Sequence, residues 1–160
     1  MNGPILSIIT VNFNNNLGLL KTLESVSSQS FSSYEHIIID AGSTDGSRET
    51  IIQYEKENPH LSFWSSESDK GIYDGMNKGI DHAKGQYLYF LNSGDCLSQD
   101  ILAKIPFDGT EYLYGDTILF YKRKTKKRVY PDTLDLIYLS DNSLHHQSCF
   151  IHHTLFKDKR

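Results

Sequence analysis

Short polar residues follow one apolar stretch of this chain, and their types could hold a metal-bound phosphate. Residues 87–91 are all leucine or aromatic, a run that predicts a buried strand. Asn92, Ser93, Gly94 and Asp95 come directly after it. A carboxylate and an amide oxygen at a strand end, where open α/β sheets bind ligands, suit a hard divalent cation carrying a phosphorylated ligand. The alternative is an ordinary polar turn leading to a helix capped by Ser98.

Two earlier apolar runs end in the same way. Thr10 and Asn12 close the run that begins at residue 5, and Asp40 closes the run 36–39. Because parallel strands present their carboxyl ends at one edge of a sheet, we expect these side chains to converge with Asn92 and Asp95 on a nucleotide-type cleft. The chain has no G-x-G-x-x-G or G-x-x-x-x-G-K-[ST] motif, the usual marker of dinucleotide oxidoreductases or P-loop enzymes.

The order of the predicted elements indicates the fold that would position these residues. Strands at 5–11, 36–40, 61–65 and 87–91 alternate with helices at 17–29, between 47 and 58, and at 72–83. This order predicts an α/β fold with a doubly wound, mostly parallel sheet and helices on both faces. After Pro106 we expect strands at 112–115, 116–121 and 147–152, a hairpin tip at 122–128 returning through Val129 and Tyr130, and a helix at 134–139. We interpret this part as a β-hairpin subregion laid against the sheet.

The composition is that of an ordinary globular protein. A length of 160 residues suits one domain, with 38% hydrophobic and 22% charged residues and a net charge of -4 that gives no attraction to nucleic acid. The two cysteines fit neither a disulfide framework nor a zinc site. The N-terminus does not resemble a signal peptide, and no apolar segment approaches the ~20 residues that cross a bilayer. We therefore expect a cytoplasmic protein.

Five segments, in order along the chain, resemble the family 2 glycosyltransferases and their GT-A (Rossmann-like) fold. They are residues 7–14 (SIITVNFN), 40–46 (DAGSTDG), 69–79 (DKGIYDGMNKG), 92–95 (NSGD) and 146–147 (HQ). The most similar subgroup builds bacterial surface polysaccharides. The resemblance implies a single domain over 1–160, in which 1–105 is the nucleotide-sugar-binding half and 106–160 a partial acceptor-side half.

The resemblance also implies a reaction and a donor pocket. The reaction is an inverting transfer of a sugar from a UDP- or dTDP-type donor to a saccharide or lipid-linked acceptor. Thr10 and Asn12 would line the base and ribose pocket, and Asp40 would accept a hydrogen bond from the base. The family's commonest form has a second aspartate after Asp40, and Ala41 replaces it here.

The segment 92–95 matches the family's metal-binding D-x-D region. Asp95 would be the ligand of Mg²⁺ or Mn²⁺, and Asn92 would contact the ribose or a water. One carboxylate together with substrate phosphates is a normal way to hold Mg²⁺. The cation would offset charge on the departing nucleoside diphosphate.

Further donor contacts are implied near residue 72. Lys70 and the N-terminus of the following helix could hold a diphosphate. Asp74 and Asn77 share one helical face and would also serve the donor, the alternative being a solvated, capped helix face. Asp45 is predicted to start a helix, and Tyr73 and Met76 to fill the core.

The resemblance places His146 and Gln147 at the sugar or diphosphate end of the cleft, on the acceptor side. A zinc site is the alternative use of the pairs His145-His146 and His152-His153. Adjacent residues of a strand point to opposite faces, so each pair could offer only one ligand to a given site, which argues against zinc.

Six cations lie between Lys122 and Arg128. They form either a solvated hairpin tip or a contact for an anionic membrane or a lipid-diphosphate acceptor. Nucleic-acid binding is disfavoured because no aromatic stacking platform accompanies the charges.

Inverting transfer needs a general base for the acceptor hydroxyl. In the family it follows the His-Gln segment, where this chain offers only Asp158 in an unlike context, so we expect the base beyond Arg160 and interpret the chain as truncated. Two other functions stay open. One is a sugar nucleotidyltransferase, although the glycine-rich, basic loop typical of those enzymes is missing after the first strand. The other is a non-catalytic nucleotide-sugar-binding module.

Overall fold

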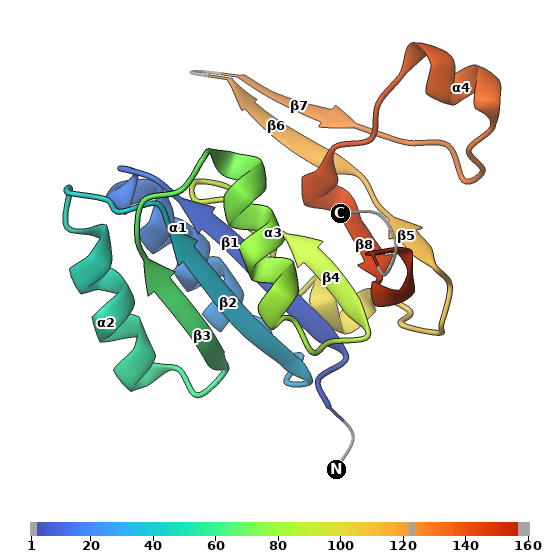
Figure 1. The fold of residues 1–160 in the computed structure, drawn as a ribbon. Helices are drawn as coiled ribbons and strands as arrows, with labels where there is room; N and C mark the ends of the chain where they lie inside the picture. The colour runs from blue at the N-terminus through green and yellow to red at the C-terminus, as the bar shows by residue number, and fades with distance from the viewer. Residues whose placement is uncertain (1–2, 122–123, 157–160) are drawn as a thin grey trace.

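A six-stranded sheet forms the centre of the computed structural model, which describes residues 3–121 and 124–156 (Figure 1). Its strand order is β3-β2-β1-β4-β8-β5. The first four of these strands are mutually parallel, and β8 pairs antiparallel with both β4 and β5. The strands are β1 (Leu6–Asn12), β2 (Tyr34–Asp40), β3 (Leu61–Ser66), β4 (Tyr87–Phe90), β5 (Tyr112–Tyr114) and β8 (Cys149–His152). This arrangement confirms the predicted doubly wound, mostly parallel sheet.

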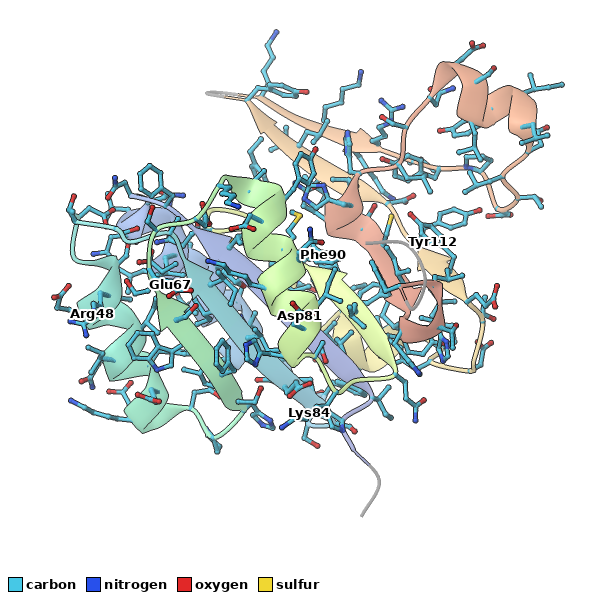
Figure 2. All side chains as sticks on the ribbon, viewed as in Figure 1. Arg48, Glu67, Asp81, Lys84, Phe90 and Tyr112 are labelled. Carbon is cyan, nitrogen blue, oxygen red and sulfur yellow. The ribbon has the colours of Figure 1, made fainter. Side chains whose placement is uncertain are left out.

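Helices cover both faces of the sheet, as predicted. On one face, α1 (Asn16–Ser27) and α2 (Ser47–Glu57) bury Leu19 and Ile51 against Ile38 of β2. On the other face, α3 (Ile72–His82) packs Met76 against the cluster that includes Phe90 of β4 (Figure 2). All seven positions of β1 and of β2 are buried, which explains why both strands are predominantly apolar at their centres.

The start of α3 crosses the sheet closely because two glycines face it. A Cβ on Gly75 would lie 2.4 Å from Val11 Cγ1, and a Cβ on Gly79 would lie 2.4 Å from Ile9 Cγ2. Tyr73 lies two residues before Gly75 and so points away from the sheet, with 77% of its surface exposed. The prediction that Tyr73 fills the core is wrong, whereas that for Met76 is confirmed.

The second part of the chain differs from its prediction in two ways. β5 and β8 join the main sheet as its antiparallel edge, and only β6 (Thr117–Tyr121) and β7 (Lys124–Arg128) form a separate hairpin. The basic run was predicted as a hairpin tip, but its residues 124–128 are the return strand itself, which ends before Val129. Lys122 and Arg123 lie outside the described residues.

The remaining elements are short. They are α4 (Leu136–Asp141) and the 3₁₀ turns η1 (Leu102–Lys104), η2 (His146–Ser148) and η3 (His153–Phe156). Within the residues that the structure describes, no helix is both long and apolar enough to span a membrane.

Candidate functional site

Asp40 is the last residue of β2, and its carboxylate is hydrogen-bonded to residues at the ends of β1 and β3. Its Oδ1 accepts hydrogen bonds from Asn12 Nδ2 at 2.7 Å and from Ser43 Oγ at 2.5 Å. Its Oδ2 accepts from the backbone N–H of Ser43 at 2.9 Å and from Ser66 Oγ at 2.6 Å. The side chain is fully buried. Asp40 therefore ties together the ends of β1, β2 and β3 and the turn that precedes α2.

These hydrogen bonds set the charge of Asp40. Burial acts to raise the pKa of its carboxyl group, but the hydrogen bonds from Ser43, Ser66 and Asn12 outweigh burial and lower the pKa below its ordinary value. The carboxylate is therefore ionised at neutral pH. Four donors occupy its approximately four acceptor positions. In this arrangement groups of the protein take all four positions, which leaves none for the expected direct hydrogen bond to the base.

Asn12 is the strand-end residue that keeps a spare acceptor. Its Nδ2 donates to Asp40 and to Ser43 Oγ, but its Oδ1 is buried and has no hydrogen-bond partner among the described residues. Thr10 lies about 6.6 Å further back along β1. It is fully buried, and its hydroxyl pairs with His36 Nε2 at 2.9 Å. The prediction that Thr10 lines the donor pocket is corrected, because Thr10 has no exposed surface.

A second pair of site residues meets where β4 ends and η2 begins. Asn92 Nδ2 lies 3.1 Å from Nε2 of His146, and Asn92 Oδ1 is buried without a partner among the described residues. Burial lowers the pKa of His146 below its ordinary value, and the opposing influence of Asp95 does not outweigh it. A neutral His146 can therefore accept the Asn92 amide hydrogen. His145, the adjacent residue, instead faces the ring of Tyr130.

Asp95 lies beside this pair and is half-buried. Gln147 Nε2 donates to Asp95 Oδ2 at 3.1 Å, and the hydroxyl of Tyr89 donates to the backbone oxygen of Gln147 at 2.7 Å. The structure thus brings His146 and Gln147 to Asn92 and Asp95, although more than fifty residues separate the two pairs in the sequence. The His-Gln segment therefore lies beside the 92–95 segment.

The first turn of α3 lies at the same edge, because Gly75 packs on Val11 directly before Asn12. Asp74 Oδ2 accepts the backbone N–H of Lys70 at 3.2 Å and pairs with Lys78 Nζ at 3.7 Å. Asp74 therefore serves the start of its own helix. The side chains of Lys70 and Asn77 are exposed. None of the described contacts joins Lys70, Asp74 or Asn77 to the Asp40 or Asp95 groups.

The donor set at the end of β4 fits a divalent cation that is held mainly by a substrate. Among the described residues, no three His, Cys, Asp or Glu side chains come together in a way that could hold a metal ion. Asp95 offers a carboxylate, and the unpaired Oδ1 of Asn92 offers a neutral oxygen nearby. Hard cations such as Mg²⁺ use one or two carboxylates, with waters and substrate phosphates as the other ligands.

Sequence reasoning missed Ser43 and Ser66 as partners of Asp40. Ser43 follows Asp40 by three residues in a glycine- and hydroxyl-rich turn, the spacing of a local side-chain-to-backbone turn, so a signal was present. Ser66 ends β3 and offered no such local signal. The prediction for Asp45 is confirmed, because its carboxylate accepts the Ser47 N–H at the start of α2 and the Asn16 N–H at the start of α1.

The fold and these strand-end groups define a GT-A-like α/β domain. The chain belongs to glycosyl transferase family 2, whose family model matches residues 7–151. An uncharacterized glycosyltransferase of Mycobacterium tuberculosis is 42% identical over 103 residues, which are 63% of this chain and 38% of that protein. A putative teichuronic acid biosynthesis glycosyltransferase of Bacillus subtilis, TuaG, is 37% identical over 101 residues, 63% of this chain and 40% of that protein. The chain thus spans less than half the length of these relatives.

Solved structures share the fold at lower identity. Staphylococcus aureus TarS 1-349 in complex with UDP superposes with a TM-score of 0.75 at 19% identity, covering 96% of this chain and 48% of that one. The mannosyltransferase PcManGT from Pyrobaculum calidifontis, in complex with GDP-Man and Mn²⁺, superposes with a TM-score of 0.57 at 21% identity over 63% of this chain and 31% of that one.

Proposed function

We propose that this chain is the donor-binding part of an inverting glycosyltransferase that transfers a sugar from a nucleoside-diphosphate sugar of UDP or dTDP type. Membership of family 2 supports the reaction class. One observation of the structure carries the site: Asn12 Oδ1 and Asn92 Oδ1, on two neighbouring strand ends, are buried acceptors without a donor in the described chain. Unpaired buried polar atoms are uncommon and call for an explanation, which a bound ligand with N–H or O–H groups supplies.

In this proposal each strand end serves one part of the donor. Asn12 accepts a hydrogen bond from the base or ribose, on a pocket floor ordered by Asp40. Asn92 contacts the ribose or a bound water, and His146 and Gln147 border the diphosphate or sugar. Lys70 and the N-terminus of α3 approach the diphosphate from the other face of the sheet, with Asp74 and Asn77 on the same helix.

Asp95 would hold a Mg²⁺ or Mn²⁺ ion together with the donor phosphates. A cation in this position supplies charge stabilisation to the departing nucleoside diphosphate. The presence of Mn²⁺ and GDP-Man with PcManGT supports a metal-assisted reaction. Gln147 holds the Asp95 carboxylate through Oδ2, so the orientation of that carboxylate is fixed before a ligand binds. None of these residues is proposed as the general base.

The acceptor is proposed to be a growing cell-surface polysaccharide or a lipid-linked saccharide. The name of TuaG, a putative teichuronic acid biosynthesis glycosyltransferase, supports this class. We further propose that 1–105 is the donor half and 106–160 part of the acceptor side of one domain. The β4–β8 pairing supports a single unit, because it joins the two parts in one sheet.

Titration calorimetry with UDP, in Mn²⁺ and then in EDTA, tests the donor site. We expect binding in Mn²⁺ that weakens strongly in EDTA and is lost in Asp95→Ala without a large change in melting temperature. Asp108→Ala is the matched control, because Asp108 caps a remote turn by accepting the Thr110 N–H. Binding only of nucleoside triphosphates would favour a nucleotidyltransferase. Nucleotide binding without transfer by any longer form of the protein would favour a binding module.

We also propose that β7 contacts an anionic membrane or a lipid-diphosphate acceptor. In the β6–β7 register, Lys124 and Lys126 lie opposite Tyr121 and Leu119, so cationic and apolar side chains share one face. Lys127 points to the other face, where it pairs with Asp116 at 2.8 Å. Each lysine at an anionic surface contributes about 1 kcal/mol.

Sedimentation with phosphatidylglycerol vesicles tests this contact. The double variant Lys124→Gln/Lys126→Gln should bind such vesicles at least about tenfold more weakly. The charge-matched control is Lys21→Gln/Lys56→Gln, which removes two exposed lysines from α1 and α2. Equal vesicle binding by the two double variants would show that β7 is only a solvated strand.

A further inference from the structure

We propose that Thr22 of α1 is a positioning residue for the Asn92–Asp95 turn. The inference rests on the proposed function, in which this turn faces the donor diphosphate and its cation. Residues 93–101 contain no helix or ladder strand, so their backbone groups need partners from elsewhere in the chain. Helix α1 and the residues that flank it supply several of those partners, while the Ser93 N–H donates to the Val11 oxygen of β1.

Polar side chains along α1 and just beyond its two ends contact residues 93–102. Asn15 Nδ2 donates to the backbone oxygen of Ser93 at 2.9 Å. Further along, Ser25 Oγ accepts the Leu97 N–H at 3.1 Å, and Gln29 Oε1, just past the helix, accepts the Leu102 N–H at 3.1 Å. The segment therefore lies on α1 through side-chain-to-backbone hydrogen bonds.

Thr22 holds the part of this segment closest to the chemistry. Its Oγ1 accepts the Gly94 N–H at 2.9 Å, and its single hydrogen faces the backbone oxygen of Asp95 at 2.8 Å and that of Gly18, one helical turn earlier, at 3.1 Å. Thr22 is fully buried. One hydroxyl thus binds both ends of the Gly94–Asp95 pair, at a point where Gly94 takes a φ of +101° that only glycine adopts readily.

Two independent contacts consequently fix Asp95. Thr22 holds its backbone from α1, and Gln147 holds its carboxylate from η2. Without the Thr22 hydroxyl, the Gly94 N–H would lose its partner and the turn would no longer be fixed on the α1 side. Loss of a residue that orients a metal ligand commonly costs about 10- to 100-fold in metal affinity. Thr22 does not itself touch the donor.

The substitution that tests this inference is Thr22→Val, which removes the hydroxyl and keeps the shape and a similar helix propensity. We expect UDP binding in Mn²⁺ to weaken by about tenfold or more, while UDP binding in EDTA changes little. Thr22→Ser, which keeps the hydroxyl, should restore the Mn²⁺-dependent part. The Gly94 amide should exchange its hydrogen with solvent at least about tenfold faster in Thr22→Val.

Ser7→Ala is the matched control. Ser7 Oγ is also fully buried, accepts a glycine N–H (Gly85, 2.8 Å) and donates to a second group (Glu35 Oε1, 2.7 Å), but it lies at the opposite edge of the sheet. This variant should leave Mn²⁺-dependent UDP binding and Gly94 exchange unchanged. Equal weakening in Ser7→Ala and Thr22→Val, or unchanged Mn²⁺-dependent binding in Thr22→Val, would overturn the inference.

The two proposals fail in different ways. If the unmodified chain binds no UDP in Mn²⁺, the proposed function fails, and Gly94 exchange alone then decides whether Thr22 positions the turn. If the unmodified chain binds UDP and Gly94 exchanges equally in Thr22→Val and Ser7→Ala, the positioning role of Thr22 fails while the proposed function stands.

Discussion

The strand β2 carries a buried carboxylate at each end, and the two ends use it differently. At the amino end, Glu35 Oε1 accepts hydrogen bonds from Ser7 Oγ at 2.7 Å and from the Lys84 N–H at 2.6 Å. These bonds fix the loop between α3 and β4, near Lys84 in Figure 2. At the carboxyl end, Asp40 accepts four hydrogen bonds, and the Oδ1 of its neighbour Asn12 is left unpaired.

We infer from this difference that Glu35 has a structural role, whereas Asp40 belongs to the proposed site. Both carboxylates are buried and hydrogen-bonded, so neither burial nor hydrogen bonding distinguishes them. The unpaired amide oxygen of Asn12 does distinguish them. It lies beside Asp40, whereas within the described structure no side-chain atom hydrogen-bonded to Glu35 belongs to a residue with an unpaired buried oxygen or nitrogen. On β2, the unsatisfied Asn12 acceptor therefore distinguishes the two ends better than the charged residues do.

Removal of the two carboxylates should give the largest contrast. Asp40→Ala leaves four donors without their acceptor and should lower the free energy of unfolding by more than about 3 kcal/mol. Glu35→Ala leaves two donors without an acceptor and should lower the free energy of unfolding by about 1–3 kcal/mol. Only Asp40→Ala should also abolish UDP binding. Urea unfolding and calorimetry measure the two effects, and a loss of UDP binding in Glu35→Ala would break the distinction.

Acid should affect the two ends of β2 in different pH ranges. Burial lowers the pKa of His36, next to Glu35, to about 3. Since the unfolded histidine takes up its proton near pH 6.5, the stability that neutral His36 provides is present above that pH. It falls by about 1.4 kcal/mol per pH unit as the pH drops from about 6 to about 4. The Asp40 pKa is lowered too, so the contribution of Asp40 is lost only as the pH falls below about 4 toward that lower value.

Urea unfolding at a series of pH values measures this dependence. The slope between pH 6 and 4 should flatten in His36→Gln and persist in His153→Gln, a control at a half-exposed histidine. An unchanged slope in His36→Gln would mean that His36 titrates normally in the folded protein.

The smallest effect is expected from one donor to Asp40. Ser66→Ala removes the hydrogen bond to Asp40 Oδ2 and should cost about 1 kcal/mol. It should also raise the Asp40 pKa, because that hydrogen bond lowers it. Ser62→Ala is the control on the same strand, where the hydroxyl makes only a 3.4 Å contact with the His36 oxygen. NMR titration of the Asp40 carboxyl carbon distinguishes them, and equal pKa values would contradict the assigned role of Ser66.

The sequence predicted β1, β2 and β4 well because every position of these strands is buried. Each has an apolar central run, and the change to polar residues at Asn12, Asp40 and Asn92 marks where that run ends. These strand ends correctly indicated which residues lie at the carboxyl edge of the sheet. They did not indicate how deeply each side chain is buried. Thr10 and Asn12 lie on the same side of β1, but Thr10, two residues earlier, is in the core and contacts His36.

The later part of the chain was harder to predict because its strands are short and exposed. Lys124 to Arg128 has the composition of a solvated loop, and only its pairing with β6 makes it a strand. The antiparallel pairing of β8 with β4 depends on contacts between residues more than sixty positions apart, for which local sequence carries no signal. The contact of Thr22 with the 92–95 turn could likewise not be predicted from the sequence, because a threonine within a helix does not by itself indicate a contact with a distant turn.

The reversed direction of β8 has a consequence for biosynthesis. Because β8 is antiparallel to β4, the turn that precedes β8 lies at the edge of the sheet where β4 ends. His146 and Gln147, which belong to this turn, therefore contact Asn92 and Asp95 only when β8 pairs with β4. During translation, the ribosome releases β1 to β4 well before β8. Until then the nascent sheet has an unpaired edge at β4, which can pair with wrong partners, and the contacts of His146 and Gln147 with the 92–95 turn are not yet formed.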